Sequence, residues 1–582
     1  MRTRVTGASA RLAGAVATGR TIVPDRLYWL IFVVLVAGAV GMRAFWVYAL
    51  EIPFVQPDSP SYLSPVIQNW LLPFSQARTG GLSMFISAGL LIFRHPVGIL
   101  IVNAILAIGS SVLLALAIKT VLRQNVLSLV ALFATAFTAK NIALEFFLMS
   151  EHPARALYVV YAALILWTLQ KPGRYGFAAL LGLAVTLDIL VKPSAVVLIV
   201  ATVMAFIAVA WFASGARPKV AATAAVFLIA SIVPLLGYMA AFKARYGTFS
   251  MTQYEGVNQF SHVGHLIQLD GGKHPLLKER LKPLIEPYAA NYAAKGNYQP
   301  NWLIYGSVTA ELKRDFADRS PARTVREYVR ERYPSEDLRW MNEVYGDIAM
   351  EAMFAHPIAY AVYAVERGYA LWQQGYAFVY YQVLPSVPRI QRHREDRELQ
   401  RKWLYEMSGE TVPPCGAGAV VPARASGVPA NLYRGPIASC DSLPYEQPLV
   451  AEVAGNVDVL YLRVTAPLAA IFPLLPKAGA IAAIAGGLLL VLLGGRRIRN
   501  IYAYGLLLAL VLFGYTALHG LINVAETLRM TVNVQDYVIV GSFVFILCLL
   551  LGLQRLLLYA IVHSRRQQHE RPLAAAEHHS AS

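Results

Sequence analysis

The stretch of this sequence with the most groups able to do chemistry is residues 51–87, EIPFVQPDSPSYLSPVIQNWLLPFSQARTGGLSMFIS. Asp58 stands there between two prolines, where the backbone cannot continue a helix from the apolar segment before it. Two interpretations of Asp58 remain open. The carboxylate either caps the helix predicted to follow, or lies at the edge of a membrane cavity as a base that accepts a proton.

A second group of ionisable residues lies further along, in EFFLMSEHP. Glu145, Glu151 and His152 border apolar segments, where an ionisable side chain is costly and therefore indicates function by default. For Glu145 the favoured interpretation is structural, an ion pair with Lys140 that marks the membrane boundary. Two carboxylates and a histidine can also hold a divalent ion. No spacing motif demands a metal, so we expect no required cofactor and leave a divalent ion open.

The elements that position these residues follow from composition. Of 582 residues, 57% are hydrophobic and 15% are charged, against about 45–50% and 25% in soluble domains. Mean hydropathy is +0.49, and several apolar runs are long enough to cross a bilayer. These values exclude a cytosolic enzyme, a secreted domain and a disordered chain. The net charge of +17 is expected in cytoplasmic loops rather than on a nucleic-acid surface.

The apolar runs predict an α-helical polytopic membrane protein with ten transmembrane helices and both termini inside. The predicted spans cover about 28–50, 96–118, 125–147, 154–170, 176–191, 194–213, 220–242, 467–494, 500–522 and 535–560. This arrangement places every short basic loop on one side, as the positive-inside tendency requires. The basic residues are Lys119, Arg123, Lys171, Arg174, Arg217, Lys219, Arg496, Arg497, Arg499, Arg565, Arg566 and Arg571.

Residues 243–466 are then predicted to form an extracytoplasmic domain, mixed but mainly helical. The stretch ARTVREYVRERYPSEDLRWMNEVY is typical of charged surface helices. Residues 356–383 are aromatic but interrupted by charge, which favours an interfacial helix over an eleventh span. Residues 467–563 hold the last three spans, and 564–582 form a cytoplasmic tail.

Several short motifs resemble the GT-C superfamily of membrane glycosyltransferases, which includes protein mannosyltransferase-like and aminoarabinose transferase-like enzymes. The first is a loop aspartate in a D-S-x-x-Y setting, followed by an R-T-G-G element that leads into an amphipathic helix. The others are FFLMSEHPARALYVVYAALIL, LVKPSAVVL and VAETLRMTVNVQDYVIVGSFVF. Residues 1–242 would then be a GT-C-like module whose first outside loop is catalytic.

The resemblance implies an inverting transferase that moves a sugar from a polyprenyl-phosphate carrier to a hydroxyl of a lipid, glycan or protein acceptor. Asp58 would be the base, with Glu151 as a second catalytic residue and His152 positioning the acceptor. A lipid phosphate needs cationic partners, for which Arg78, Lys192 and Arg529 are the leading candidates. Lys243 and Arg245 are better explained as snorkelling cations. Tyr62 could stack on a sugar ring.

Two other functions remain open at this point. An O-antigen polymerase or ligase also consumes lipid-linked sugars and has a large outside loop late in the chain. A transporter or flippase of lipid-linked sugars is less consistent with the sequence, which has no evident inverted repeat. All three functions place the protein in the plasma or inner membrane, with the site facing the periplasm or exterior. Membrane lipid is then a partner and nucleic acid is not.

We predict a disulfide between Cys415 and Cys440, which both fall in the predicted outside domain, whereas Cys548 lies in the last span. An oxidising compartment favours pairing, and closing a loop of about 25 residues contributes about 3 kcal/mol in the chain-entropy model. Thiol labelling of the non-reduced protein should modify Cys548 alone. Labelling of both outside cysteines would instead indicate two separate thiols.

Overall fold

The computed structural model describes part of the chain, in which helices predominate and strands are absent. One isolated parallel bridge joins Phe54 to Phe147. The described residues are 23–50, 53–54, 59–68, 73–76, 78–93, 97–122, 125–137, 142, 144–212, 217–263, 266–294, 321–333, 338–362, 452–453 and 463. The three predicted spans after residue 466 lie outside this set, as does 363–383 of the predicted interfacial helix.

Four described helices are long and apolar enough to cross a membrane: α2 (Asp25–Leu50), α5 (Val97–Leu122), α8 (Glu151–Gln170) and α11 (Arg217–Tyr246). They correspond to the first, second, fourth and seventh predicted spans. The fifth and sixth correspond to shorter apolar helices, α9 (Tyr175–Val191) and α10 (Val197–Phe212). A 3₁₀ turn, η1 (Pro193–Val196), separates these two helices, because proline cannot continue α9.

The predicted third span, 125–147, is not one continuous helix among the described residues, although residues 142, 144 and 145 are helical. Helix α6 ends at Ala136 (Asn125–Ala136), and residues 146–150 are not helical. The backbone of 146–148 instead bonds to Phe54, and Glu145 is paired with a residue of α2. Tertiary partners therefore satisfy polar groups that hydropathy assigned to a continuous helix.

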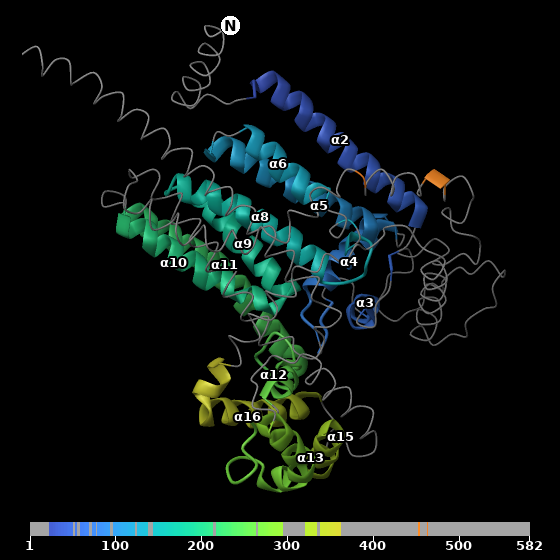
Figure 1. Ribbon diagram of the computed structural model, residues 1–582, viewed down its shortest axis with the longest axis vertical. Helices are drawn as coiled ribbons and strands as arrows, with labels where there is room; N and C mark the ends of the chain where they lie inside the picture. The colour runs from blue at the N-terminus through green and yellow to red at the C-terminus, as the bar shows by residue number, and fades with distance from the viewer. Residues whose placement is uncertain are drawn as a thin grey trace, which may run out of the picture.

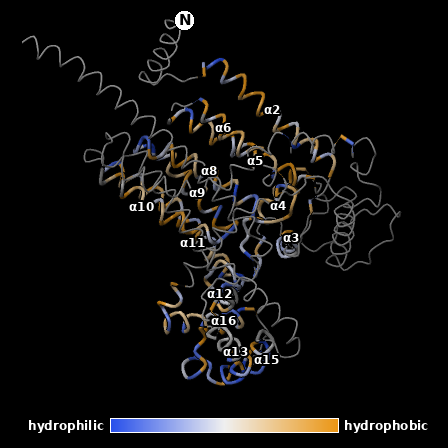
Figure 2. The backbone as a smooth tube through the Cα atoms, in the orientation of Figure 1, coloured by the Kyte–Doolittle hydropathy of each residue, from blue (hydrophilic) through white to orange (hydrophobic). Residues whose placement is uncertain are grey.

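The apolar helices pack into one bundle with α8 near its centre (Figure 1). Of the residues in the most apolar 18-residue stretch of α8, 89% are buried, against 22% in the corresponding stretches of α2 and α11. Helix α8 contacts α5 on one side and α9 on the other, and α11 packs against α9. These helices consist mostly of hydrophobic residues, and hydrophilic residues become more frequent beyond α11 (Figure 2). The outer helices thus present apolar surface where lipid is expected.

Two short helices lie in the first predicted outside loop, α3 (Ser59–Gln68) and α4 (Gly81–Phe93). The expectation of an amphipathic helix after R-T-G-G is wrong for α4. Its exposed large side chains are all apolar, and they are Met84, Leu91, Ile92 and Phe93. An apolar outer face beside the bundle suits contact with lipid rather than water.

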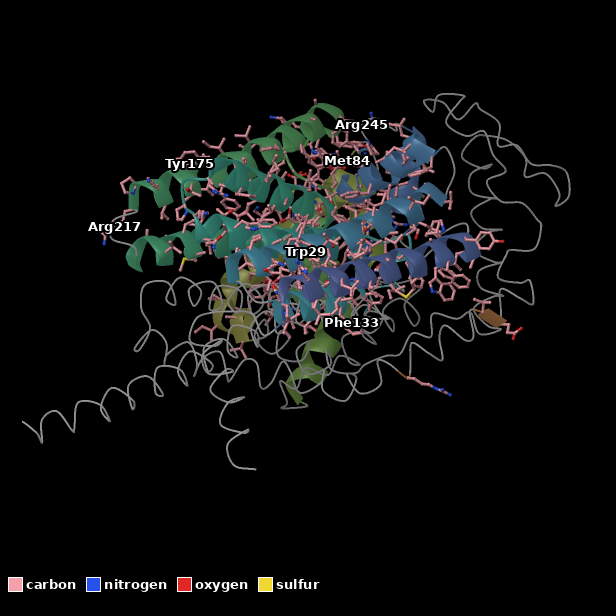
Figure 3. The ribbon with its side chains drawn as sticks, turned by 90° about the horizontal axis from the view of Figure 1, so that it is seen from above. Trp29, Met84, Phe133, Tyr175, Arg217 and Arg245 are labelled. Atoms are coloured by element: carbon pink, nitrogen blue, oxygen red, sulfur yellow. The ribbon has the colours of Figure 1, made fainter. Side chains whose placement is uncertain are left out.

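The two ends of the bundle differ in chemistry. At one end lie the start of α11 and the turn between α8 and α9, where the amide of Gly173 donates to Thr223 Oγ1. Figure 3 shows Tyr175 and Arg217 at this end, with Met84 and Arg245 toward the opposite end. Five of the basic residues assigned to inside loops lie at the first end: Lys119, Lys171, Arg174, Arg217 and Lys219.

After α11 the chain forms a small helical unit with its own core, made of α12 (Glu255–Val263), α13 (Pro275–Ala294), α15 (Pro321–Arg332) and α16 (Leu338–Ala355). The predicted charged surface helices are confirmed as α15 and α16. Apolar side chains of α13, α15 and α16 are fully buried against one another, including Leu281, Val325, Val329 and Val344. Surface ion pairs such as Arg280–Glu331 bridge α13 and α15.

Candidate functional site

The candidate site lies at the end of the bundle opposite Lys171, Arg174 and Arg217, which we call the loop end. Here residues 53–54, 59–68, 73–76, 78–80 and 144–150 meet the start of α8, the end of α9 and the end of α11. The described residues of the first two predicted outside loops therefore lie together. The sequence separates them by about ninety positions, as the contact between Ser59 and Leu148 shows (|i−j| = 89).

Arg78 and Tyr62 form one part of the site. The Arg78 guanidinium lies 5.5 Å from the centroid of the Tyr62 ring, within the range of a cation–π interaction. The Tyr62 hydroxyl lies 3.4 Å from Ser150 Oγ, so this aromatic residue connects the R-T-G-G element with the residue before α8. The Tyr62 backbone carbonyl accepts a hydrogen bond from Ser83 at 2.7 Å, which holds α3 against α4.

Glu151 and Lys192 form the second part. Lys192 Nζ lies 3.4 Å from Glu151 Oε1, and both side chains are buried. Glu151 is in the first turn of α8 and Lys192 directly follows α9, so each charge is favourably placed relative to its helix dipole. Asp188, one turn before Lys192, is 2% exposed and interacts with Lys192 electrostatically. Its Oδ1 has no hydrogen-bond partner among the described residues.

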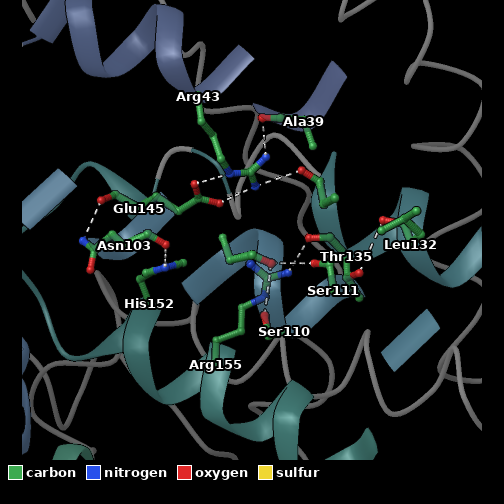
Figure 4. Close-up of polar contacts among 12 residues, drawn as sticks. Ala39, Arg43, Asn103, Ser110, Ser111, Leu132, Thr135, Glu145, His152 and Arg155 are labelled. Atoms are coloured by element: carbon green, nitrogen blue, oxygen red, sulfur yellow. Dashed lines mark hydrogen bonds and ion pairs between the residues drawn. The ribbon is translucent and has the colours of Figure 1, made fainter. Parts of the chain in front are cut away.

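The structure therefore brings four of the predicted site residues together: Tyr62, Arg78, Glu151 and Lys192. A continuous series of contacts runs from Arg78 through Tyr62 to Ser150, and from its neighbour Glu151 to Lys192. His152 differs from them. Its ring is 1% exposed, and its Nε2 lies 2.9 Å from the carbonyl oxygen of Asn103 inside the bundle (Figure 4).

The segment that contains Asp58 is fixed on both sides, although Asp58 itself lies outside the described residues. Before it, the Phe54 amide donates to Phe146 O at 2.7 Å, and the Leu148 amide donates to Phe54 O at 2.9 Å. After it, Ser59 Oγ donates to Leu148 O at 2.7 Å. Both attachments are therefore made to the same short segment, residues 146–148.

Helix α11 holds the other side of the first loop. The Gly80 amide donates to the Tyr238 hydroxyl at 3.0 Å, and the Tyr246 hydroxyl donates to Phe74 O at 3.0 Å. The amide of Gln253, just beyond α11, donates to Gln76 O at 2.7 Å. Arg78 lies between Gln76 and Gly80, whose hydrogen bonds to Gln253 and Tyr238 hold the backbone on both sides of it. The position of the Arg78 guanidinium is set by this backbone.

Gly81 is required where the R-T-G-G element meets α9, because a Cβ there would collide with the backbone of Leu190 and Val191. We expect Gly81→Ala to destabilise the protein by about 1–3 kcal/mol, as overpacking does. Gly41→Ala is the matched control, since nothing lies within 4 Å of that Cβ, and it should stabilise α2 by about 0.5–1 kcal/mol. Thermal unfolding in detergent measures both variants, and equal stability would contradict the close approach.

Two buried charges in this region were missed by sequence reasoning, Arg43 on α2 and Asp188 on α9. Each is a charged residue inside an apolar run, which is itself a signal of function. The structure also gives Glu145 the partner Arg43, whereas the sequence favoured Lys140, which lies outside the described residues. Lys243 and Arg245 are exposed in the last turn of α11.

Other predicted features are not described by the structure, namely Arg529, Cys415 and Cys440. The described residues contain no group of three or more His, Cys, Asp or Glu side chains able to hold a metal ion. Within that part of the chain, Glu151 contacts Lys192 and His152 contacts a backbone carbonyl.

Fold and site together define an α-helical protein with candidate membrane-spanning helices and a cluster of aromatic and charged side chains at one end. Comparison with protein-family models, with curated proteins and with solved structures gives no match for this chain. The function is therefore inferred from the geometry of the site and from the sequence motifs.

Proposed function

We propose that this protein is a polytopic, ten-span enzyme of the plasma or inner membrane, an inverting glycosyltransferase of the GT-C type. Its donor would be a sugar on a polyprenyl-phosphate carrier, and its acceptor a hydroxyl of a lipid, glycan or protein. The loop end would face the periplasm or exterior. The observation that carries the proposal is the contiguous set of Arg78, Tyr62, Glu151 and Lys192 beside the fixed flanks of Asp58.

The chemistry assigned to these groups is a single displacement. Asp58 accepts the proton of the acceptor hydroxyl while that oxygen attacks the anomeric carbon from the face opposite the phosphate. The new glycosidic bond forms as the bond from carbon to phosphate oxygen breaks, which inverts the configuration. The electron pair leaves with the polyprenyl phosphate, whose growing charge needs cations nearby.

Lys192 and Arg78 are the described cations that suit this role, and Arg529 is a third candidate by sequence. Glu151 holds Lys192 at the loop end and would release it to a bound phosphate. The Tyr62 ring lies next to Arg78 and is 6% exposed, so it is assigned the holding of the guanidinium rather than stacking on a sugar. His152 is given no substrate contact, since its ring is enclosed in the bundle.

The test is turnover of radiolabelled polyprenyl-phosphate hexoses and pentoses by the purified protein, with a membrane lipid extract as the acceptor source. Transfer of label with inverted anomeric configuration supports the proposal. Label that crosses the bilayer of proteoliposomes without a new bond would instead indicate a transporter. Consumption of lipid-linked oligosaccharides alone would indicate a polymerase or ligase.

A further inference from the structure

A bidentate ion pair lies inside the bundle beneath the candidate site. Arg43 Nη2 and Nε donate to the two carboxylate oxygens of Glu145 at 2.6 and 2.7 Å, and each side chain is 1% exposed. The remaining guanidinium contacts go to backbone carbonyls, Ala39 O at 3.3 Å and Ala136 O at 2.9 Å. As Figure 4 shows, Arg43 joins α2, the end of α6 and the segment of Glu145.

Glu145 begins the segment on which the site is built. We call residues 145–148 the loop-binding segment, because Phe146 and Leu148 make three hydrogen bonds to Phe54 and Ser59, which flank Asp58. The position of Glu145 therefore sets the position of those hydrogen-bonding groups. Two residues of the candidate site follow within six positions of Glu145: Ser150, which contacts Tyr62, and Glu151, which contacts Lys192.

The same residue is connected to α8 by a second route. Asn103 Nδ2 of α5 donates to the Glu145 backbone carbonyl at 2.8 Å, and Asn103 O lies 2.9 Å from His152 Nε2. His152 directly follows Glu151, which holds Lys192. The ion pair is thus connected through Asn103 and His152 to the residue next to Glu151, and through Phe146 and Leu148 to Phe54 and Ser59.

Stability alone is a weak explanation for such a pair. A buried ion pair is commonly no more stabilising than a well-packed apolar pair of similar volume. What the forked guanidinium adds is direction, since two parallel hydrogen bonds fix the carboxylate in one orientation. Glu145 is 102 residues from Arg43 in the sequence, so the pair fixes one loop relative to the first apolar helix.

We propose that Arg43 and Glu145 are positioning residues, which hold the loop-binding segment so that Phe54, Ser59 and the Glu151–Lys192 pair keep the arrangement that turnover requires. This inference rests on the proposed function for its catalytic meaning. The structural part of the inference does not depend on the proposed function. It states that without the ion pair the hydrogen bonds of residues 146–148 to Phe54 and Ser59 lose their fixed geometry.

The decisive variant replaces both charges, Arg43→Met with Glu145→Leu, because each single change leaves a buried charge unpaired. We expect the double variant to unfold at about the temperature of the unchanged protein, yet to turn over the donor about 10²-fold more slowly, through kcat rather than KM. Arg43→Lys keeps the charge without the fork and should recover only part of the rate. The matched control is Tyr161→Phe, which removes a buried hydrogen bond of 3.0 Å to Thr202 and should leave turnover unchanged.

Hydrogen exchange at the Phe54 and Leu148 amides provides a readout that does not require activity. In the double variant these amides should exchange at least tenfold faster, and in Tyr161→Phe they should not change. Full turnover together with unchanged exchange in the double variant overturns the inference. If the unchanged protein transfers no sugar from any donor, the proposed function fails. In that case hydrogen exchange at the Phe54 and Leu148 amides alone tests whether the ion pair fixes the hydrogen bonds of residues 146–148. Unchanged exchange in the double variant overturns that claim.

Discussion

Asp58→Asn is expected to lower the turnover of polyprenyl-phosphate sugar by about 10²–10⁴-fold, the usual cost of losing a general base. The amide keeps the shape of the side chain but cannot take the proton of the acceptor hydroxyl. Binding of the donor should change little, so the loss should appear in kcat. Initial rates at saturating donor, with expression and thermal unfolding measured in parallel, provide the test.

The matched control is Asp270→Asn, a change of the same kind in the helical unit beyond α11. Asp270 is largely exposed and pairs with Lys282 at 3.0 Å, and surface pairs of this kind contribute little. Its turnover should remain within about twofold of the unchanged protein, since surface changes move stability by only about 0.5 kcal/mol. Near-normal turnover by folded Asp58→Asn would remove Asp58 from the mechanism and leave only its helix-capping interpretation.

Lys192→Met is expected to lower kcat by about 10²–10³-fold, the cost of removing one group that stabilises developing negative charge. The buried ammonium is placed by Glu151 at 3.4 Å and by its position at the end of α9. Its loss would remove a cation that contacts buried Glu151 and interacts with buried Asp188, so stability should also fall. Rates and thermal unfolding together measure the two effects.

A second variant separates these effects. Lys192→Met combined with Glu151→Gln removes both charges of the ion pair and should regain part of the lost stability without regaining turnover, since Asp188 still lacks the cation. Lys192→Arg keeps a cation and should retain part of the rate, because guanidinium and ammonium place their donors differently. A double variant that recovers both stability and turnover would show that the pair is structural only.

Local pattern accounts for the helices that the sequence located correctly. Apolar runs of span length and charged segments with helical periodicity are properties of neighbouring residues, and α2, α5, α8 and α11 follow from them. The candidate residues Tyr62, Arg78, Glu151 and Lys192 were also found by residue type and motif. Arg43 and Asp188 could have been found from the sequence too, because each is a single charged residue within an apolar run.

The sequence by itself determined which segments are apolar and helical and which residues carry useful chemistry, because both depend on the local chain. Only the tertiary structure decided which charges pair and where a span stops. Glu145 pairs with Arg43 from another helix, and α6 ends at Ala136 while residues 146–148 bond to Phe54. Such choices depend on how helices pack across some hundred residues, and a buried charge takes the partner that packing brings within reach.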